Sequence, residues 1–280
     1  MLDITAISKT FHPGTPNARQ ALRQLSLHLE DGEFATIVGS NGAGKSTLFG
    51  AIAGSFYTDE GRILLDGTDL TFQPEHQRSR VIGRLFQDPM RGTAPHMTIE
   101  ENLGLAYSRG KKRGFSLGVK KSDEEFFREK LRELNLGLED RLKTPMGLLS
   151  GGQRQRISIA QALITNPGFI IADEPVSALD VSIQAQVLNL LQQLQKDFNL
   201  TYLFISHDLS VVEMISDRIG VMYLGTIVET APKKELYANP RHPYTRALLS
   251  AVPIPDPEVK KERITLKGDL PSPSNPPSGC

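Results

Sequence analysis

The segment Gly39–Ser46 reads GSNGAGKS and matches the phosphate-binding pattern G-x-x-x-x-G-K-[ST]. Glycines let backbone N–H groups converge on phosphate oxygens, and a helix N-terminus behind them favours negative charge. A glycine-rich turn can also arise by chance, but this one lies between an expected strand and an expected helix. The pattern therefore indicates a nucleotide site, with Lys45 on the terminal phosphates and Ser46 on Mg²⁺. The expected nucleotide contacts are Gly39, Asn41, Gly42, Gly44, Lys45, Ser46 and Thr47.

Two adjacent carboxylates follow the apolar run FIIA in Phe169–Pro175, which reads FIIADEP. Asp173 is suited to the magnesium shell, and Glu174 is suited to polarising the water that attacks a phosphate. Alone, an Asp-Glu pair after a strand is more often an exposed loop than a catalytic site. The phosphate-binding loop upstream favours the catalytic interpretation.

A second candidate anion site is the segment Leu149–Gln155, which reads LSGGQRQ and begins a helical stretch. A serine and two glycines at a helix N-terminus can bind an anion, although Ser150 could equally be an ordinary N-cap. One nucleotide needs only one phosphate-binding helix N-terminus, so the residues alone do not assign a role to this second anion site.

The elements that must position these residues follow from apolar periodicity. Strands are expected in the first thirty residues on either side of His12–Asn17, and at Phe34–Val38, Phe169–Ala172 and Tyr202–Ile205. Helices are expected at Ser46–Ala53, Ile157–Thr165 and Ile183–Leu194, and in an insertion between about Gln87 and Gly147 that includes Asp123–Leu136. Alternating strands and helices predict a parallel, doubly wound α/β core with a small antiparallel layer at the N-terminus. After Ala231 the composition becomes Pro-rich, which favours an extended, irregular appendage.

Composition narrows the function classes. The 280 residues are 39% hydrophobic and 23% charged, and 32 basic residues balance 32 acidic ones, so no global field attracts nucleic acid or anionic lipid. The basic stretch Arg109–Arg113 has no interleaved aromatic residues and is interpreted as a solvated face. No apolar run approaches a membrane span, and the start lacks the order of a signal peptide. Cys280 is the single cysteine, which excludes a disulfide framework within one chain.

Taken together, these segments resemble the ABC ATPase family, in which GSNGAGKST, LSGGQ, IIADEP, SALD and ISHD occur in this order and at similar spacing. The resemblance covers essentially residues 1–250. It implies an α/β P-loop NTPase fold of the ABC type, with a mixed or parallel sheet core, a small antiparallel β subdomain and an α-helical subdomain inserted at about 88–152. It places the ATPase domain at residues 1–230 and a C-terminal extension at 231–280.

The resemblance also gives the second anion site a purpose. In similar proteins, the LSGGQ of one subunit faces the γ-phosphate held by the phosphate loop of the other subunit. Ser150, Gly151, Gly152 and Gln153 would therefore complete the ATP site of a second ABC ATPase subunit, which is either identical or paralogous. Asp180 of the SALD segment would bridge the two subunits.

Three further residues take roles from the same resemblance. Phe11 would stack on adenine, Gln87 would touch Mg²⁺ and the attacking water, and His207 would contact the γ-phosphate. Outside the set of motifs, each has a plainer interpretation. Phe11 could be a core aromatic, Gln87 a polar loop residue and His207 a hydrogen-bonded structural histidine.

A single cassette without fused membrane spans resembles the separately encoded subunits of bacterial importers. The segments NPRHPYTRALLSAVP and LKGDLPSPSNPPSGC look like the C-terminal region of oligopeptide and dipeptide importer ATPases. The resemblance implies ATP and Mg²⁺ as ligands, and integral membrane permease subunits and, indirectly, a substrate-binding protein as partners. It also implies a peripheral location at the cytoplasmic face of the membrane. Peptide uptake is the leading expectation, and no nucleic-acid partner is expected.

Residues 1 to about 155 resemble a different importer group, linked to tryptophan-type and basic-membrane-lipoprotein systems. The two resemblances meet at LSGGQRQ, so either a chimera or one lineage with mixed features would explain them.

The functional alternatives are a cassette for amino acids or other small molecules and a non-transport ABC ATPase, while a phosphate-loop kinase or GTPase would leave LSGGQ without a role. In the peptide group the tail usually continues into cysteines that hold an iron–sulfur cluster. Because Cys280 is the last residue and one thiolate cannot hold such a cluster, no iron–sulfur centre and a truncated extension are expected.

Overall fold

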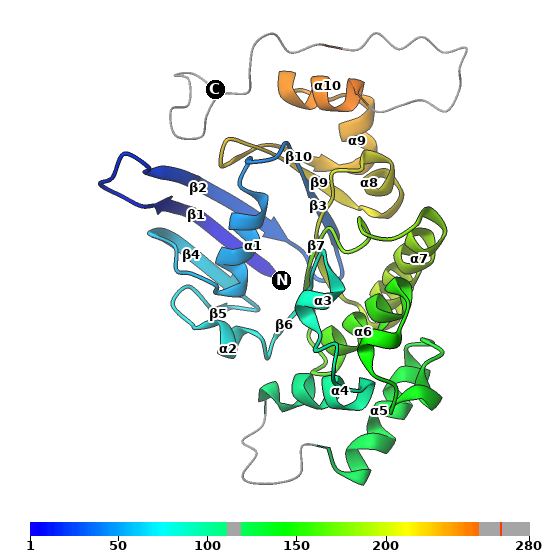
Figure 1. The fold of residues 1–280 in the computed structure, drawn as a ribbon. Coiled ribbons are helices and arrows are strands. Elements are labelled where there is room, and N and C mark those ends of the chain that lie inside the picture. The colour runs from blue at the N-terminus through cyan, green and yellow to red at the C-terminus, as the bar shows by residue number, and fades with distance from the viewer. Residues whose placement is uncertain (111–118, 252–263, 265–280) are drawn as a thin grey trace, which may run out of the picture. The chain divides into compact units, whose positions relative to one another are not determined.

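A computed structural model describes residues 1–110, 119–251 and 264 of the chain. The chain divides into two compact units, one made of Met1–Gln73 with Leu203–Cys280 and the other of Pro74–Tyr202. Figure 1 shows the fold. Within the described residues, no helix combines the length and the apolar character that crossing a membrane requires.

The first unit begins with a four-stranded sheet in the order β2-β1-β4-β5, whose pairings are all antiparallel. Its strands are β1 (Leu2–Phe11), β2 (Arg19–Leu29), β4 (Glu60–Leu65) and β5 (Thr68–Asp69). Alternate side chains such as Leu25, Leu27 and Leu29 are buried, which is the period of a strand with one covered face. The antiparallel layer predicted at the N-terminus is confirmed.

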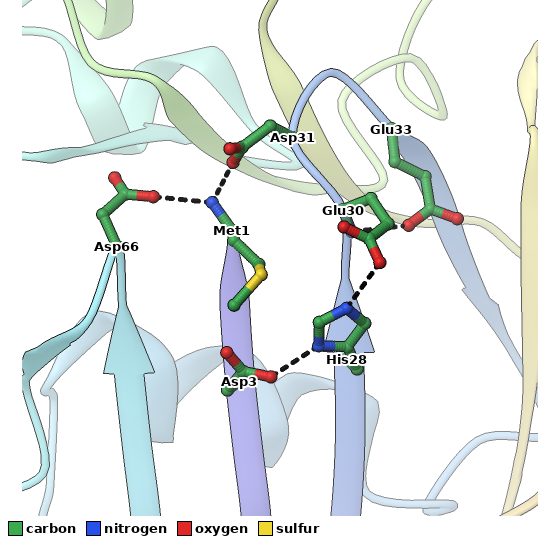
Figure 2. Close-up of polar contacts among 7 residues, drawn as sticks. All are labelled: Met1, Asp3, His28, Glu30, Asp31, Glu33 and Asp66. Atoms are coloured by element: carbon green, nitrogen blue, oxygen red, sulfur yellow. Dashed lines mark hydrogen bonds and ion pairs between the residues drawn. The ribbon is translucent and has the colours of Figure 1, made fainter.

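Polar contacts join one end of this sheet, as Figure 2 shows. The N-terminal ammonium of Met1 contacts the carboxylates of Asp31 and Asp66. His28 of β2 lies opposite Asp3 of β1 and contacts it through Nδ1, while its Nε2 contacts Glu30 at 2.9 Å. The hydrogen bonds with Asp3 and Glu30 raise the pKa of His28 above its ordinary value.

The strands that carry the phosphate loop also lie in the first unit. The fully buried β3 (Phe34–Val38) pairs in parallel with β9 (Arg218–Tyr223), which pairs antiparallel with β10 (Thr226–Pro232). Helix α1 (Lys45–Ala53) follows β3 and ends at Gly54, whose φ of 83° suits glycine. Helix α8 (Leu209–Ile215) follows β8 (Thr201–Ile205), which contains the boundary between the units. The predicted strand and helix around the loop are confirmed.

The second unit pairs β6 (Ile82–Leu85) in parallel with β7 (Phe169–Asp173). Its helices are α2 (Glu75–Arg78), α3 (Pro89–Gly92), α4 (Ile99–Tyr107), α5 (Lys121–Glu133), α6 (Gly151–Leu163) and α7 (Val181–Phe198). The helix expected near Asp123–Leu136 is α5, which buries Phe127 and Leu131 completely. Most of the basic stretch predicted to be a solvated face lies outside the described residues.

The expectation of irregular backbone after Ala231 is wrong for the described part of that segment. Two helices form there, α9 (Lys233–Ala238) and α10 (Pro243–Ser250). Pro243 occupies the first turn of α10, where the missing N–H is not needed, and His242 caps the helix by accepting a hydrogen bond from the Tyr244 N–H at 3.1 Å. Proline therefore starts a helix here, so proline content alone misjudged the segment.

Candidate active site

The phosphate loop depends on glycine at two positions. A Cβ on Gly39 would lie 2.2 Å from the backbone oxygen of Met222 in β9. Gly44 has a φ of 108°, and a Cβ there would lie 2.7 Å from the backbone oxygen of Ala21. Gly44 is also the N-cap of α1 and brings no side chain to the start of that helix. The loop therefore presents backbone at a helix N-terminus, which is the form that binds phosphate.

Lys45 is held within this loop. Its side chain is only 8% exposed, and its Nζ donates to the backbone oxygens of Gly39 at 2.8 Å and Ser40 at 3.0 Å. Ser46 is exposed and Thr47 is half-buried at the start of α1. Two backbone carbonyls of the loop thus hold one buried ammonium, and this positive charge fits an anionic ligand.

The two predicted catalytic carboxylates lie at the end of β7 in the second unit. Asp173 is the last residue of the strand, and Glu174 follows with a φ of 45°, a left-handed conformation that costs a non-glycine residue about 1–2 kcal/mol. Ser177 supports this turn because its backbone N–H and its hydroxyl donate to the Glu174 carbonyl at 3.1 and 3.0 Å.

Gln87 comes to the same place from the segment after β6. Its Nε2 donates to Oε2 of Glu174 at 3.3 Å, so two residues expected to handle the attacking water are in direct contact. The hydroxyl, carboxylate and amide oxygens of Ser46, Asp173 and Gln87 are the hard ligands that Mg²⁺ prefers, so the predicted metal set fits that ion by donor chemistry.

Ser150 is the N-cap of α6, as its plainer interpretation states. Ser150 and Gln153 form a capping box, in which Ser150 Oγ accepts from the Gln153 N–H at 3.3 Å and Gln153 Oε1 accepts from the Ser150 N–H at 3.0 Å. Capping does not exclude the anion role, which stays a prediction.

The LSGGQ segment lies against the first turn of α7. A Cβ on Gly152 would lie 2.5 Å from Cγ2 of Ile183, which is too close, whereas a Cβ on Gly151 would lie 3.5 Å from Cδ2 of Leu179, an ordinary van der Waals distance. Asp180 caps α7 by accepting from the Ile183 N–H at 3.0 Å. The structure therefore brings together Gly152 and the turn that Asp180 organises.

Phe11 and His207 belong to the first unit. Phe11 ends β1, is half-buried and packs edge-to-face on Phe56, with ring centroids 5.2 Å apart and Lys9 Nζ 5.9 Å from its ring. His207 is exposed between β8 and Asp208, which caps α8. The roles predicted for these two residues stay predictions.

A contact between the phosphate loop and the C-terminal region was not predicted from the sequence. The backbone N–H of Ser40 donates to the hydroxyl of Tyr244 in α10 at 2.7 Å. The sequence signal that could have drawn attention to it is a tyrosine that directly follows a proline, a residue favoured in the first turn of a helix, but the segment was interpreted as irregular.

Comparisons with known proteins agree with this geometry. The ABC transporter family matches residues 22–177, and the family described as oligopeptide/dipeptide transporter, C-terminal region, matches residues 228–280. The oligopeptide transport ATP-binding protein AppF of Bacillus subtilis is 47% identical over 93% of this chain and 79% of AppF. Its counterpart OppF of Escherichia coli is 47% identical over 95% of this chain and 79% of OppF.

Among solved structures, the chain is similar to a dimeric post-hydrolysis state of the ATP-binding cassette MJ0796 bound to ADP and Pi. The TM-score is 0.71 at 27% identity, over 83% of this chain and 99% of that one. The family match, the relatives and the similar structure thus point to the same family. The chain belongs to the ABC transporter family and is an ATPase of that family.

Proposed function

We propose that this ATPase powers the uptake of peptides across the cytoplasmic membrane through separate permease subunits. The observation that carries the proposal is that similarity to two oligopeptide transport ATP-binding proteins runs through both the phosphate-loop region and the C-terminal region. A cassette for amino acids or other small molecules is the alternative, and the C-terminal match favours peptides over it.

In this proposal the loop around Lys45 binds the phosphates of ATP. Ser46, Asp173 and Gln87 would hold Mg²⁺, which would supply charge neutralisation at the phosphates. Glu174 accepts a proton from the attacking water while the bond between the γ-phosphorus and the bridging oxygen breaks, releasing ADP and phosphate. Gln87 orients Glu174 and the water, and its hydrogen bond to the Glu174 carboxylate supports this role. His207 contacts the γ-phosphate.

The proposal includes a second ABC ATPase subunit. Ser150 to Gln153 complete the ATP site of that partner, Asp180 bridges the two subunits, and Phe11 stacks on adenine. A dimeric cassette bound to ADP and Pi among the similar structures supports this arrangement. The helical segment at about 88–152 meets the permease at the cytoplasmic face, and a substrate-binding protein delivers the peptide. The C-terminal extension then begins near residue 231.

The sequence left open whether the two halves come from one lineage or from a chimera, with the first half like tryptophan-type or lipoprotein-type importers. We infer a single lineage. Supporting this, similarity to the same oligopeptide relatives covers 93–95% of the chain, across the point where the two resemblances met.

ATPase activity of the purified chain, measured against protein concentration, tests the core of the proposal. Two half-sites must meet to make one active centre, so the rate per subunit should rise with concentration. Glu174→Gln should retain ATP binding with little turnover, whereas Glu129→Gln on the exposed face of α5 is a matched control that should hydrolyse ATP normally. Normal turnover by Glu174→Gln would show that another group is the base.

The transported substrate needs a separate measurement. When the chain is reconstituted in vesicles with the permease subunits and the substrate-binding protein of a peptide importer, ATP should drive the accumulation of labelled peptides and not of free amino acids. Accumulation of amino acids alone would favour the small-molecule alternative. Ser150→Arg should preserve ATP binding by the monomer but block ATP-driven dimerisation, and an unaffected dimer would contradict the composite site.

A further inference from the structure

The C-terminal helix α10 contacts the phosphate loop directly. Tyr244 lies in the first turn of α10 and is 7% exposed, and its hydroxyl accepts the hydrogen bond from the Ser40 N–H at 2.7 Å. These residues are 204 positions apart in the chain. A region outside the ABC transporter match at 22–177 therefore supplies a side chain to the nucleotide loop.

The contact acts on a peptide group that Lys45 also holds. The peptide that joins Gly39 to Ser40 has its C=O on Gly39, which accepts from Lys45 Nζ at 2.8 Å, and its N–H on Ser40, which donates to Tyr244. In a planar trans peptide these two groups point in opposite directions. Tyr244 and Lys45 therefore hold opposite edges of one peptide plane and fix its rotation.

Tyr244 is itself fixed by its surroundings. Its ring lies 4.5 Å from the ring of Tyr223 in β9, between centroids, and it shares a buried cluster with Val38, the last residue of β3 before the loop. Ahead of the helix, the Glu229 carboxylate of β10 accepts the backbone N–H of Arg241 at 2.8 Å and that of His242 at 3.0 Å. These contacts anchor the start of α10, so the hydroxyl of Tyr244 is held in a fixed position as a hydrogen-bond acceptor.

A plainer explanation is that a buried tyrosine hydroxyl simply needs a partner. It would predict an effect on stability alone. The structure favours the positioning explanation because the hydroxyl of Tyr244 binds the N–H of Ser40, and the carbonyl of the same peptide group, on Gly39, binds Lys45. Disturbing this amide must therefore also disturb Lys45.

We propose that Tyr244 is a positioning residue of the nucleotide site, and that through it the C-terminal region sets the affinity for ATP. The inference rests on the proposed function of the loop as the ATP site. Tyr244→Phe keeps the ring and its packing on Tyr223 but removes the acceptor of the Ser40 N–H. Losing one such hydrogen bond should raise KM for ATP about three- to tenfold, with kcat within about twofold, because the loop is less preorganised before binding.

The experiment compares the parent chain of 280 residues with its variants Tyr244→Phe, Ser250→Ala and Lys45→Ala. Ser250→Ala is the matched control, because it removes a hydroxyl hydrogen bond, to the Ala247 carbonyl at 2.7 Å, from the same helix without touching the loop. The measurements are KM and kcat for ATP, the Kd of a fluorescent ATP analogue, and Tm. A rise in KM and Kd in Tyr244→Phe, absent in Ser250→Ala, is the expected result.

Two outcomes would overturn the inference while leaving the ATP site intact. One is an unchanged KM for ATP in Tyr244→Phe, whether or not Tm or kcat falls, and the other is an equal rise in KM in Ser250→Ala. Lys45→Ala separates these from failure of the proposed function. If that variant binds and hydrolyses ATP like the parent, the loop is not the ATP site and the role of Tyr244 falls with it.

Discussion

Replacing Gly44 by alanine tests whether the backbone of the phosphate loop demands glycine. Two separate penalties apply. The φ of 108° lies outside the conformations that alanine adopts easily, which costs about 1–3 kcal/mol. The new Cβ would also lie 2.7 Å from the Ala21 backbone oxygen, so the loop must shift, at about 1–3 kcal/mol more. Gly44→Ala should therefore lower the free energy of unfolding by roughly 2–6 kcal/mol.

Gly67→Ala is the matched control in the same unit. Gly67 has a φ of 74°, close to the left-handed helical region, and a Cβ there would meet nothing within 4 Å. Only the backbone penalty of about 1–2 kcal/mol remains. Urea unfolding followed by circular dichroism should therefore place the midpoint of Gly44→Ala clearly below that of Gly67→Ala.

Nucleotide binding should separate the same two variants. Gly44 is the N-cap of α1, so a shift there displaces the first turn, including Lys45. Misplacement of binding groups by a fraction of an ångström weakens binding strongly, and we expect ATP affinity to fall at least about tenfold in Gly44→Ala and to stay normal in Gly67→Ala. Equal midpoints, or equal ATP affinities, in the two variants would refute the reasoning.

Three further predictions concern other parts of the fold. The hydrogen bond with Asp3 is the main cause of the raised pKa of His28. The protonated imidazole therefore stabilises the sheet fully at a pH below the ordinary histidine pKa, and this stabilisation is lost as the pH rises through the raised pKa of the folded state. The free energy of unfolding should fall more between about pH 6 and 8 in the parent than in His28→Gln. Gly152→Ala should lower the free energy of unfolding by about 1–3 kcal/mol because the new Cβ meets Ile183. Ile183→Ala should destabilise the Gly152→Ala variant less than it destabilises the parent, which a double-mutant cycle would measure. Leu131→Ala should cost about 2–5 kcal/mol in chemical denaturation because the side chain is fully buried, and a smaller cost would mean that α5 relaxes into the cavity.

The elements around the phosphate loop could be predicted from the sequence because local signals agree there. The apolar run of β3, the glycines and the start of α1 all specify the same strand-loop-helix unit. Glu174 could be nominated from the residues, as a carboxylate after an apolar strand downstream of a phosphate loop, whereas Gln87 could be nominated only by family resemblance. Their contact joins residues 87 positions apart, and no local pattern encodes such a distance.

The C-terminal helices show why composition failed. The prediction weighed proline content over the whole segment, whereas helix formation depends on where each proline lies. Pro232 is the N-cap of α9 and Pro243 lies at the start of α10, and both positions tolerate a missing N–H. Leu236 of α9 and Tyr244 of α10 are buried in one cluster with Ile219 and Val221 of β9. Tertiary burial therefore completes helices that are too short to be stable alone.

Because of the same burial, the C-terminal segment contributes to the stability of the domain that carries the phosphate loop. Leu236 and Tyr244 lie in one buried cluster with Val38 and Val221, which are the strand residues behind the phosphate loop. Burying a large apolar side chain contributes about 1.5–3 kcal/mol, so the two C-terminal members together contribute several kcal/mol. The whole stability of a domain is about 5–15 kcal/mol. A loop that binds phosphate through backbone N–H groups needs a rigid support, and in this chain α9 and α10 provide part of it.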